Sequence, residues 1–420
     1  MKRVAIIGLG YVGLPLAIEF GKKFYTIGYD IDKSRVKKLS RFIDDNKEVK
    51  KNSFKDSKYL NFSSKLNSIK NSNYFIITLP TPINKRKLPD MKSIISFSKT
   101  LGKILKKGDI VIYESTVYPG ATNELFTPIL EKNSNLKEGK DFFCAYSPER
   151  INPGDKENTL RKINKVISSN NPNTLNSIDR LYKSIGIKTY KTPNILVAEF
   201  SKLLENIQRD VNIALINEFT KISNSFNVSI YDILNAASSK WNFLKFFPGL
   251  VGGHCIKVDP YYLINASKKR NIESNLILTA RKVNESMPSY IFKNFITNLK
   301  LKKINLDKAK IVILGYTFKE DCSDIRNSLV YDLIIKLKKK ISNISVYDPL
   351  VSDEKLLPKK IKSNFIKTLT NNKYDGMIII NSHSVFKNFS NNQIINFCKK
   401  NHVIYDLKKT FPLITKSMTF

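Results

Sequence analysis

Short apolar runs alternate with longer amphipathic stretches through the first half of the chain. Runs of this length, bounded by polar or turn residues, are typical of strands buried on both faces of a sheet. They cover residues 4–7, 25–29, 74–79, 110–113 and 142–145. Because longer segments suited to helices separate them, the pattern predicts βαβ units around a parallel sheet.

The pattern changes in the middle of the chain and then returns. Residues 195–226 form one long helical pattern without Gly or Pro, and helical patterns continue to Leu299. Strand-like runs reappear at 311–314, 344–347 and 377–380. We therefore predict an α/β protein with two Rossmann-like, doubly wound parallel-sheet domains joined by a long helix and an all-helical middle domain. The predicted boundaries are 1–194, 195–300 and 301–420.

The charge of the chain changes this picture little. Lys and Arg number 71 against 36 Asp and Glu, which gives a net charge of +35 over 420 residues. The lysines recur from end to end and do not interleave with aromatic residues as a platform for single strands would require. We therefore predict no nucleic-acid partner. The charge favours a polyanionic small molecule as the partner.

The cysteines and the apolar runs indicate the compartment. Cys144, Cys255, Cys322 and Cys398 lie far apart, without the spacing of a disulfide framework or a zinc site, so we predict no metal and a reducing cytoplasm. Residues 2–18 imitate a signal peptide, but they carry spaced glycines and no cleavage site follows. No other apolar run reaches the roughly 18–20 residues that span a bilayer, so no membrane partner is expected.

A glycine-rich turn follows the first predicted strand. Gly8, Gly10 and Gly13 have the GxGxxG spacing between a strand and an apolar helix. The first glycine permits a tight turn, the second lets backbone N–H groups approach a pyrophosphate, and the third allows close packing of helix and strand. Asp30 ends the second strand, where a carboxylate can accept hydrogen bonds from ribose hydroxyls. The turn therefore predicts NAD binding, although the nearby Arg35 and Lys33 weaken the preference over NADP.

One cysteine has an environment suited to chemistry. Cys255 follows two glycines in GGHCIKVDPY at 252–261, with Asp259 four residues on and basic groups on either side. A cationic neighbour lowers a thiol pKa and increases the thiolate fraction, so Cys255 is a candidate nucleophile. His254 is more suited to a conformational or hydrogen-bonding role than to that of the base. The other three cysteines are interpreted as buried small hydrophobes.

The long helical pattern supplies a second pair of candidates. Lys202 and Asn206 are four residues apart, so they lie on one helical face and can reach the same small volume. A helical lysine is ordinarily exposed to solvent, and from the spacing alone that interpretation is the stronger one.

Three separated motifs then occur in a definite order: AEFSKLLEN at 198–206, GGHCIKVDPY at 252–261 and GYTFKED at 315–321. Over essentially the whole chain they resemble the UDP-glucose/GDP-mannose dehydrogenase family. YSPERINPG at 146–154, together with Gly-Gly-His-Cys in place of Gly-Gly-Ser-Cys, resembles the branch of UDP-N-acetylhexosamine 6-dehydrogenases. Within that branch the Vi-antigen-type UDP-N-acetylglucosamine dehydrogenases look most similar.

The resemblance implies a four-electron oxidation of a sugar C6 alcohol to the uronate, with NAD, for surface polysaccharide precursors. It implies that Cys255 forms a thiohemiacetal and then a thioester, that Lys202 and Asn206 stabilise the oxyanion, and that Glu149 is the base for hydrolysis. Asp259 would orient a water or the lysine, with Thr116 as a further ligand of that water. Pro153 and Gly154 stand where UDP-glucose members have a second carboxylate.

The resemblance also implies the remaining contacts and a homodimer through the helical middle. The second sheet domain has Gly315 without the other glycines of a dinucleotide loop, so it is expected to bind the UDP-sugar. Candidate cofactor contacts are Gly8, Gly10, Tyr11, Val12, Gly13, Asp30, Arg35, Thr81, Thr116 and Arg326. Candidate substrate contacts are Glu149, Arg150, Lys202, Asn206, Phe247, Gly249, Gly253, Tyr261 and Lys319.

Several alternatives stay open at this point. The sugar can be GlcNAc, GalNAc or ManNAc, since these epimers differ by one hydroxyl, and UDP-glucose is a further alternative. A single-step dehydrogenase of the hydroxyacid type shares the layout of a sheet domain followed by helices but requires no cysteine. A scaffold or nucleic-acid-binding protein would need a vestigial glycine turn, and the intact Gly8, Gly10, Gly13 and Asp30 argue against it.

Overall fold

The computed structural model describes residues 2–46, 48–150, 160–351 and 356–414. The chain divides into two compact units: Met1–Glu205 with Tyr261–Glu273, and Asn206–Pro260 with Ser274–Phe420. The division falls inside one continuous helix, so the predicted helical middle is shared between the two units. The three predicted domain boundaries therefore stay a prediction.

The first unit contains an eight-stranded sheet with the order β3-β2-β1-β4-β5-β6-β7-β8. All neighbours pair in parallel except β6 and β7, which pair antiparallel. The strands are β1 (Arg3–Ile7), β2 (Tyr25–Tyr29), β3 (Leu60–Ser63), β4 (Tyr74–Ile77), β5 (Ile110–Tyr113), β6 (Phe143–Tyr146), β7 (Lys165–Ser169) and β8 (Thr189–Lys191). The five strands predicted for this half are confirmed, whereas β3, β7 and β8 were not predicted.

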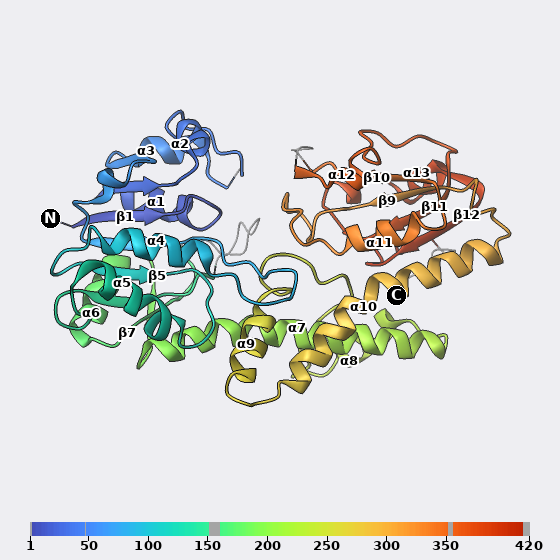
Figure 1. Cartoon of the computed structure of the whole chain (residues 1–420). Helices are drawn as coiled ribbons and strands as arrows, with labels where there is room; N and C mark the ends of the chain where they lie inside the picture. The colour runs from blue at the N-terminus through green and yellow to red at the C-terminus, as the bar shows by residue number, and fades with distance from the viewer. Residues whose placement is uncertain (1, 47, 151–159, 352–355, 415–420) are drawn as a thin grey trace. The chain divides into compact units, whose positions relative to one another are not determined.

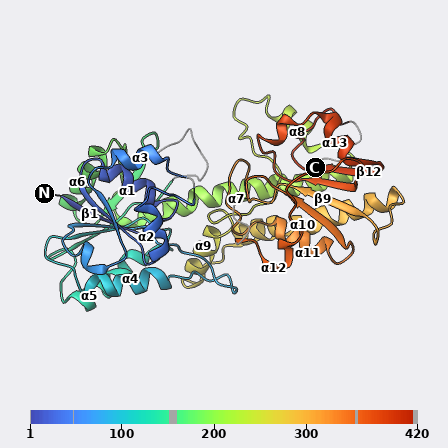
Figure 2. The ribbon, with the colours of Figure 1, turned by 90° about the horizontal axis from the view of Figure 1, so that it is seen from above.

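Helices cover both faces of this sheet. The main ones are α1 (Gly13–Gly21), α2 (Lys33–Leu39), α3 (Lys51–Asp56), α4 (Lys92–Gly102), α5 (Thr127–Ser134) and α6 (Pro172–Ser184). Figure 2 shows α1 and α6 on one side of the strands and α4 and α5 on the other. Alternate strand residues such as Ile6 and Ile112 pack with Leu14 of α1 and Leu181 of α6 in one buried cluster. The predicted double winding is therefore confirmed here.

Long helices follow in sequence, as predicted. They are α7 (Ile195–Ser225), α8 (Ile230–Ala237), α9 (Asp259–Lys268) and α10 (Asn275–Leu301), and Figure 1 shows α7 as one uninterrupted helix. The predicted all-helical section contains an irregular segment, residues 238–258, between α8 and α9. Pro248 and three glycines in this segment disfavour helix, which is the physical reason for the difference.

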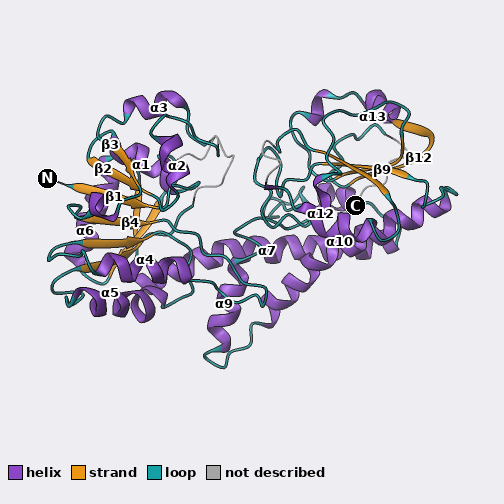
Figure 3. Ribbon diagram, turned by 45° about the horizontal axis from the view of Figure 1, so that its top comes forward, coloured by secondary structure: helices purple, strands orange, loops and turns teal. Residues whose placement is uncertain are grey.

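The second unit contains a parallel sheet with the order β10-β9-β11-β12. Its elements are β9 (Lys310–Leu314), α11 (Val330–Leu337), β10 (Asn343–Tyr347), α12 (Lys359–Lys362), β11 (Tyr374–Ile379), α13 (Asn391–Phe397) and β12 (Cys398–Asp406). Figure 3 shows these strands together, and the three predicted strands are confirmed.

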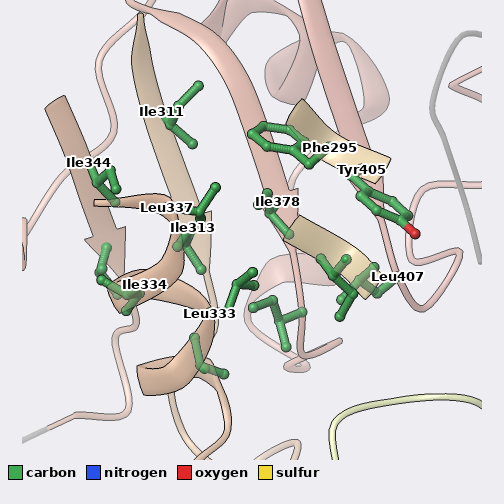
Figure 4. Close-up of a cluster of buried hydrophobic side chains, with 14 of the residues drawn as sticks. Phe295, Ile311, Ile313, Leu333, Ile334, Leu337, Ile344, Ile378, Tyr405 and Leu407 are labelled. Carbon is green, nitrogen blue, oxygen red and sulfur yellow. The ribbon is translucent and has the colours of Figure 1, made fainter. Parts of the chain in front are cut away.

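Two buried clusters hold this sheet between helices. On one face Ile311, Ile313 and Ile378 pack against Phe295 of α10 and Leu333 of α11 (Figure 4). On the other face Val312 and Met377 pack against Ile394 of α13. This unit is thus also wound on both faces. Across the described ranges, no helix combines the length and the apolar character required to cross a bilayer.

Candidate functional site

The glycine turn after β1 has the geometry of a dinucleotide loop. Gly8 has a φ of +92°, and its N–H donates to the Tyr29 carbonyl at 2.8 Å. A Cβ on Gly13 would lie 1.8 Å from the Gly8 oxygen, so no other residue fits there. At Gly10, by contrast, no described atom lies within 4 Å of the Cβ position. The second glycine therefore leaves open space for a pyrophosphate in front of the N-terminus of α1.

Asp30, directly after β2, and Arg35 of α2 both hold this turn. Oδ2 of Asp30 accepts the Leu9 N–H at 2.8 Å, and Oδ1 accepts the Asp32 N–H at 2.9 Å. The Arg35 guanidinium donates to the Leu9 carbonyl at 3.1 and 3.0 Å and pairs with Asp44 at 2.7 Å. Arg35 is therefore engaged by the protein itself, and a contact between Asp30 and the ribose stays a prediction.

The other predicted cofactor residues of this unit follow the same edge of the sheet. Tyr11 and Val12 lie in the turn before α1, and Thr81 and Thr116 follow β4 and β5. Thr81 is buried, and its carbonyl accepts the Tyr262 hydroxyl at 2.7 Å. Because ligands of parallel sheets bind at the carboxyl ends of the strands, these residues and the open Gly10 position together fit NAD.

Glu149 lies in a buried ionic cluster that the sequence analysis did not predict. The ammonium of Lys165 is 3.2 Å from Oε2 of Glu149 and 2.9 Å from Oε2 of Glu114. The Tyr182 hydroxyl donates to Oε1 of Glu114. All four side chains are buried. Glu114 directly follows the apolar run 110–113, and Lys165 directly precedes the run that begins at Val166. This position beside a buried strand is the sequence signal that could have indicated them.

Lys202 and Arg150 approach Glu149 differently. Contrary to the ordinary expectation for a helical lysine, Lys202 is buried, and its ammonium donates to the Glu149 carbonyl oxygen at 2.6 Å. The Arg150 N–H donates to Oε1 of Glu149 at 2.5 Å, and its guanidinium pairs with Glu205. The rest of the predicted motif, residues 151–154, lies outside the described residues.

Cys255 lies in the irregular segment of the second unit. Its side chain is exposed, and its carbonyl accepts the N–H groups of Val258 and Asp259, which begins α9. Gly253 has a φ of +85°, and a Cβ there would lie 2.7 Å from the Phe318 ring. This glycine therefore allows the close approach that shapes the turn before the cysteine.

Polar residues surround this turn. Asn206 donates to Oδ2 of Asp259 at 2.5 Å, and both side chains are buried. Burial, followed by the charge of Arg326, lowers the pKa of His254. This shift favours the neutral imidazole, which agrees with the expected hydrogen-bonding role.

A network of buried polar side chains contacts the backbone on both sides of the Cys255 turn, at Gly249 and at Ile256. Asn217 of α7 donates to the Gly249 carbonyl at 3.0 Å and accepts the Gly249 N–H at 2.9 Å. Asn217 also donates to Asn284 of α10, whose amide donates to Asp210 at 2.7 Å. Arg281 pairs with Asp210 at 2.6 Å and reaches the Ile256 carbonyl at 3.4 Å.

The remaining predicted residues of the second unit lie in exposed or half-buried positions. Lys245 lies over the exposed Phe247 ring at 5.7 Å, and Lys319 is half-buried in the turn after β9. The Arg326 guanidinium forms a forked pair with Asp324, with hydrogen bonds of 2.6 to 3.0 Å. Tyr261 is buried and belongs to the first unit, where Lys87 lies over its ring at 4.9 Å.

The fold and these residues define a class of protein. A doubly wound sheet with an intact dinucleotide turn, a second nucleotide-type sheet and an exposed cysteine in a glycine-rich turn are features of a dehydrogenase that uses NAD. The chain belongs to the UDP-glucose/GDP-mannose dehydrogenase family. Residues 2–186 match the family's NAD-binding domain, residues 196–286 its central domain, and residues 312–412 its UDP-binding domain.

Individual relatives agree with this assignment. The chain is 45% identical to a UDP-N-acetyl-D-glucosamine 6-dehydrogenase of Pseudomonas aeruginosa, covering 97% of this chain and 96% of that protein. It is 44% identical to a Salmonella typhi protein of the same name, over 98% and 96%. The solved UDP-D-ManNAc dehydrogenase of Pyrococcus horikoshii is 29% identical, with a TM-score of 0.89 over 100% of this chain and 99% of that one.

These matches confirm the predicted family and the enzyme class. The chain is an NAD-dependent oxidoreductase whose second nucleotide domain takes a UDP-sugar. The sequence-based prediction of NAD and of a sugar nucleotide is therefore confirmed.

Proposed function

We propose that this enzyme oxidises the C6 alcohol of UDP-N-acetylglucosamine to the uronate. The observation that carries the proposal is the 44–45% identity, over nearly full length, to two proteins named for that activity. The solved dehydrogenase named for the ManNAc epimer has lower identity, 29%. Among the N-acetylhexosamine epimers left open by the sequence, the comparison therefore favours GlcNAc.

Cys255 is proposed as the covalent nucleophile. NAD, when bound, accepts the hydride removed from C6 in each oxidation. The Cys255 thiolate adds to the aldehyde carbon and gives a thiohemiacetal, whose oxidation leaves a thioester. The exposure of Cys255 and the glycine-rich turn before it support this role, because a nucleophile must be reachable by substrate.

Lys202 and Asn206 are proposed to stabilise the oxyanion, and Glu149 to act as the base. A well-placed donor contributes about 3–4 kcal/mol to such a transition state. Both donors are buried, and Asn206 is oriented by Asp259, as the role requires. Glu149 takes the proton of the water that attacks the thioester. Thr116 and Asp259 are proposed to orient water.

The UDP-sugar contacts are proposals of the same kind. We assign Phe247, Gly249, Gly253 and Tyr261 to the uridine and pyrophosphate, and Lys319 and Arg150 to the sugar nucleotide. The support from this structure is that two hydrogen bonds to Asn217 hold Gly249 and that Gly253 lies close against the Phe318 ring. Arg326 is assigned to the cofactor.

A substrate panel tests the proposed activity. We would measure NADH formation with UDP-GlcNAc, UDP-GalNAc, UDP-ManNAc and UDP-glucose at matched concentrations. The expected result is a kcat/KM for UDP-GlcNAc at least about tenfold above the others, because one misplaced hydroxyl leaves buried polar groups unpaired. A higher kcat/KM for UDP-ManNAc or UDP-glucose would reject the substrate assignment.

We further propose that the enzyme is a homodimer through its helical segment. Leu215, Phe219 and Ile222 of α7 and the following Phe226 are spaced as one helical face and are 47–74% exposed. A row of large apolar side chains of this kind is typical of a protein interface. Light scattering should give twice the chain mass for the wild type and for L301D, and the single chain mass for F219D. An unchanged mass for F219D would reject this surface.

A further inference from the structure

Lys165 lies at the centre of the buried ionic cluster beside Glu149. Lys165 bridges Glu114 and Glu149 with its ammonium, and Tyr182 donates to Glu114. Lys165 is 5% exposed and Glu114 2%. Because an ammonium buried without partners would lose its charge, Lys165 keeps its charge in this position only beside its carboxylate partners.

The topology of the sheet explains why these residues meet. β6 and β7 pair antiparallel, with Ala145 opposite Ser169 and Tyr146 opposite Ser168. In an antiparallel pair the partner's residue number falls by one for each residue gained. Continuing this register beyond Tyr146 places Glu149 opposite Lys165. The start of β7 therefore lies at the edge where β5 and β6 end.

Because side chains alternate between the two faces of a strand, Glu114, Glu149 and Lys165 lie on the same face of the sheet. Tyr113 of β5 is level with Tyr146 of β6, so Glu114 is level with Ser147. Ser147 and Glu149 are two residues apart and share a face, which is the face covered by α6. Tyr182 of α6 lies in the buried cluster on that face. Glu114, Glu149 and Lys165 are thus brought together by strand register.

The cluster contains two carboxyl groups, Glu114 and Glu149, but only one ammonium, that of Lys165. Burial raises the pKa of Glu114 to about 7, with Lys165 opposing this rise and Glu149 adding to it. Burial alone would lower the pKa of Lys165, but Glu114 and Glu149 outweigh it and raise that pKa. Lys165 therefore stays charged, and Glu114 is the carboxyl group that readily takes up the surplus proton.

We propose that Lys165 is a positioning residue for Glu149: anchored on Glu114, its ammonium fixes the Glu149 carboxylate and keeps it ionised for the hydrolytic step. The inference rests on the proposed function. In that step the water oxygen bonds to the thioester carbon, the water proton goes to Glu149, and the C–S bond breaks with its electron pair going to the Cys255 sulfur. Lys202 holds the Glu149 backbone oxygen, so carboxylate and main chain are fixed from two sides.

Three lysine variants test the proposal. K165M removes the charge, K165R keeps it, and K183M is the control, since Lys183 is an exposed lysine paired with Asp179. For K165M we expect acid formation to slow by about 100-fold, as on losing a general base. An initial burst of NADH should remain, and the sugar acyl group should add to the mass of the chain. K165R should recover most of the rate, and K183M should match the wild type.

The pH profile separates positioning from mere stability. Among the described residues, Glu114 and Lys165 are titratable groups in contact with or near the Glu149 carboxylate, and Tyr182 lies behind Glu114. The Lys202 ammonium lies at the Glu149 carbonyl oxygen, and the neighbouring Arg150 guanidinium pairs with Glu205. In K165M the attraction of the ammonium is lost, which raises the Glu149 pKa, so the acidic limb of kcat should move up by about one pH unit. In E114Q, Lys165 pairs with Glu149 alone, so the Glu149 pKa should fall and the acidic limb of kcat should move to lower pH.

Defined outcomes overturn the proposal. If K165M lowers only the melting temperature, with kcat, its pH profile and the acyl mass unchanged, Lys165 is structural. If K165M does not fold, an unmoved acidic limb in E114Q would likewise show that Lys165 is structural. Failure of the proposed function looks different, because then the wild type forms no uronate or E149Q accumulates no acyl group on Cys255.

Discussion

The proposed covalent mechanism depends on one side chain, the thiol of Cys255. C255S keeps the shape of the turn but carries a hydroxyl that is far harder to deprotonate than a thiol. We expect near-normal affinity for NAD and UDP-GlcNAc, measured by calorimetry, and loss of acid formation by at least about 1,000-fold. E149Q should differ by retaining a thioester, visible in the intact mass. Wild-type rates of acid formation in C255S would show that the cysteine is structural.

Asp30 is the residue that we propose favours NAD over NADP. Its carboxylate repels a 2′-phosphate, and the nearby Arg35 is held by Leu9 and Asp44. In D30N we expect the ratio of kcat/KM for NAD over NADP to fall by about 10- to 100-fold, since a hydrogen bond to a charged group contributes about 1.5–3 kcal/mol. D32N is the control, because Asp32 caps α2 and should affect stability alone. An unchanged ratio in D30N would contradict the assignment.

At the scale of elements, the buried Arg281–Asp210 pair joins α10 to α7 beneath the Cys255 segment. Removing one partner leaves a buried charge uncompensated, so R281M should lower the free energy of unfolding by about 3–5 kcal/mol. R281M/D210L should recover part of this loss, because apolar groups replace both charges. Thermal unfolding measures the series, with K282M as an exposed control on the same helix. Equal melting temperatures for R281M and K282M would show that the pair contributes nothing.

For the whole molecule, the stoichiometry distinguishes the four-electron enzyme from a single-step dehydrogenase. Alcohol to acid releases four electrons and each NAD takes two, so we expect two NADH for each UDP-GlcNAc consumed, measured by absorbance against product quantified by chromatography. A ratio of one, with an aldehyde or ketone as the product, would mean that the enzyme carries out a single oxidation only.

The strongest sequence signals were local in origin. Gly8, Gly10 and Gly13 could be assigned because each meets a backbone requirement within a few residues, and the predicted strands of both sheets were found because buried parallel strands are continuous apolar runs. Four strands lack such a continuous apolar run: β3 is short, β7 and β8 have polar ends, and β12 begins with CKKNH. Their place in the sheets depends on neighbours distant in sequence.

The long helix, the glycine turn, the Cys255 segment and the apolar strands of both sheets could be predicted because each depends on residues adjacent in the chain. The antiparallel pairing of β7 with β6, which brings Lys165 to Glu149 and Glu114, arises from contacts between distant segments. So does the pairing of Arg281 with Asp210 across two helices. A buried charge is stable only beside its partner, and which residue becomes that partner depends on strand register and helix packing between segments far apart in the chain.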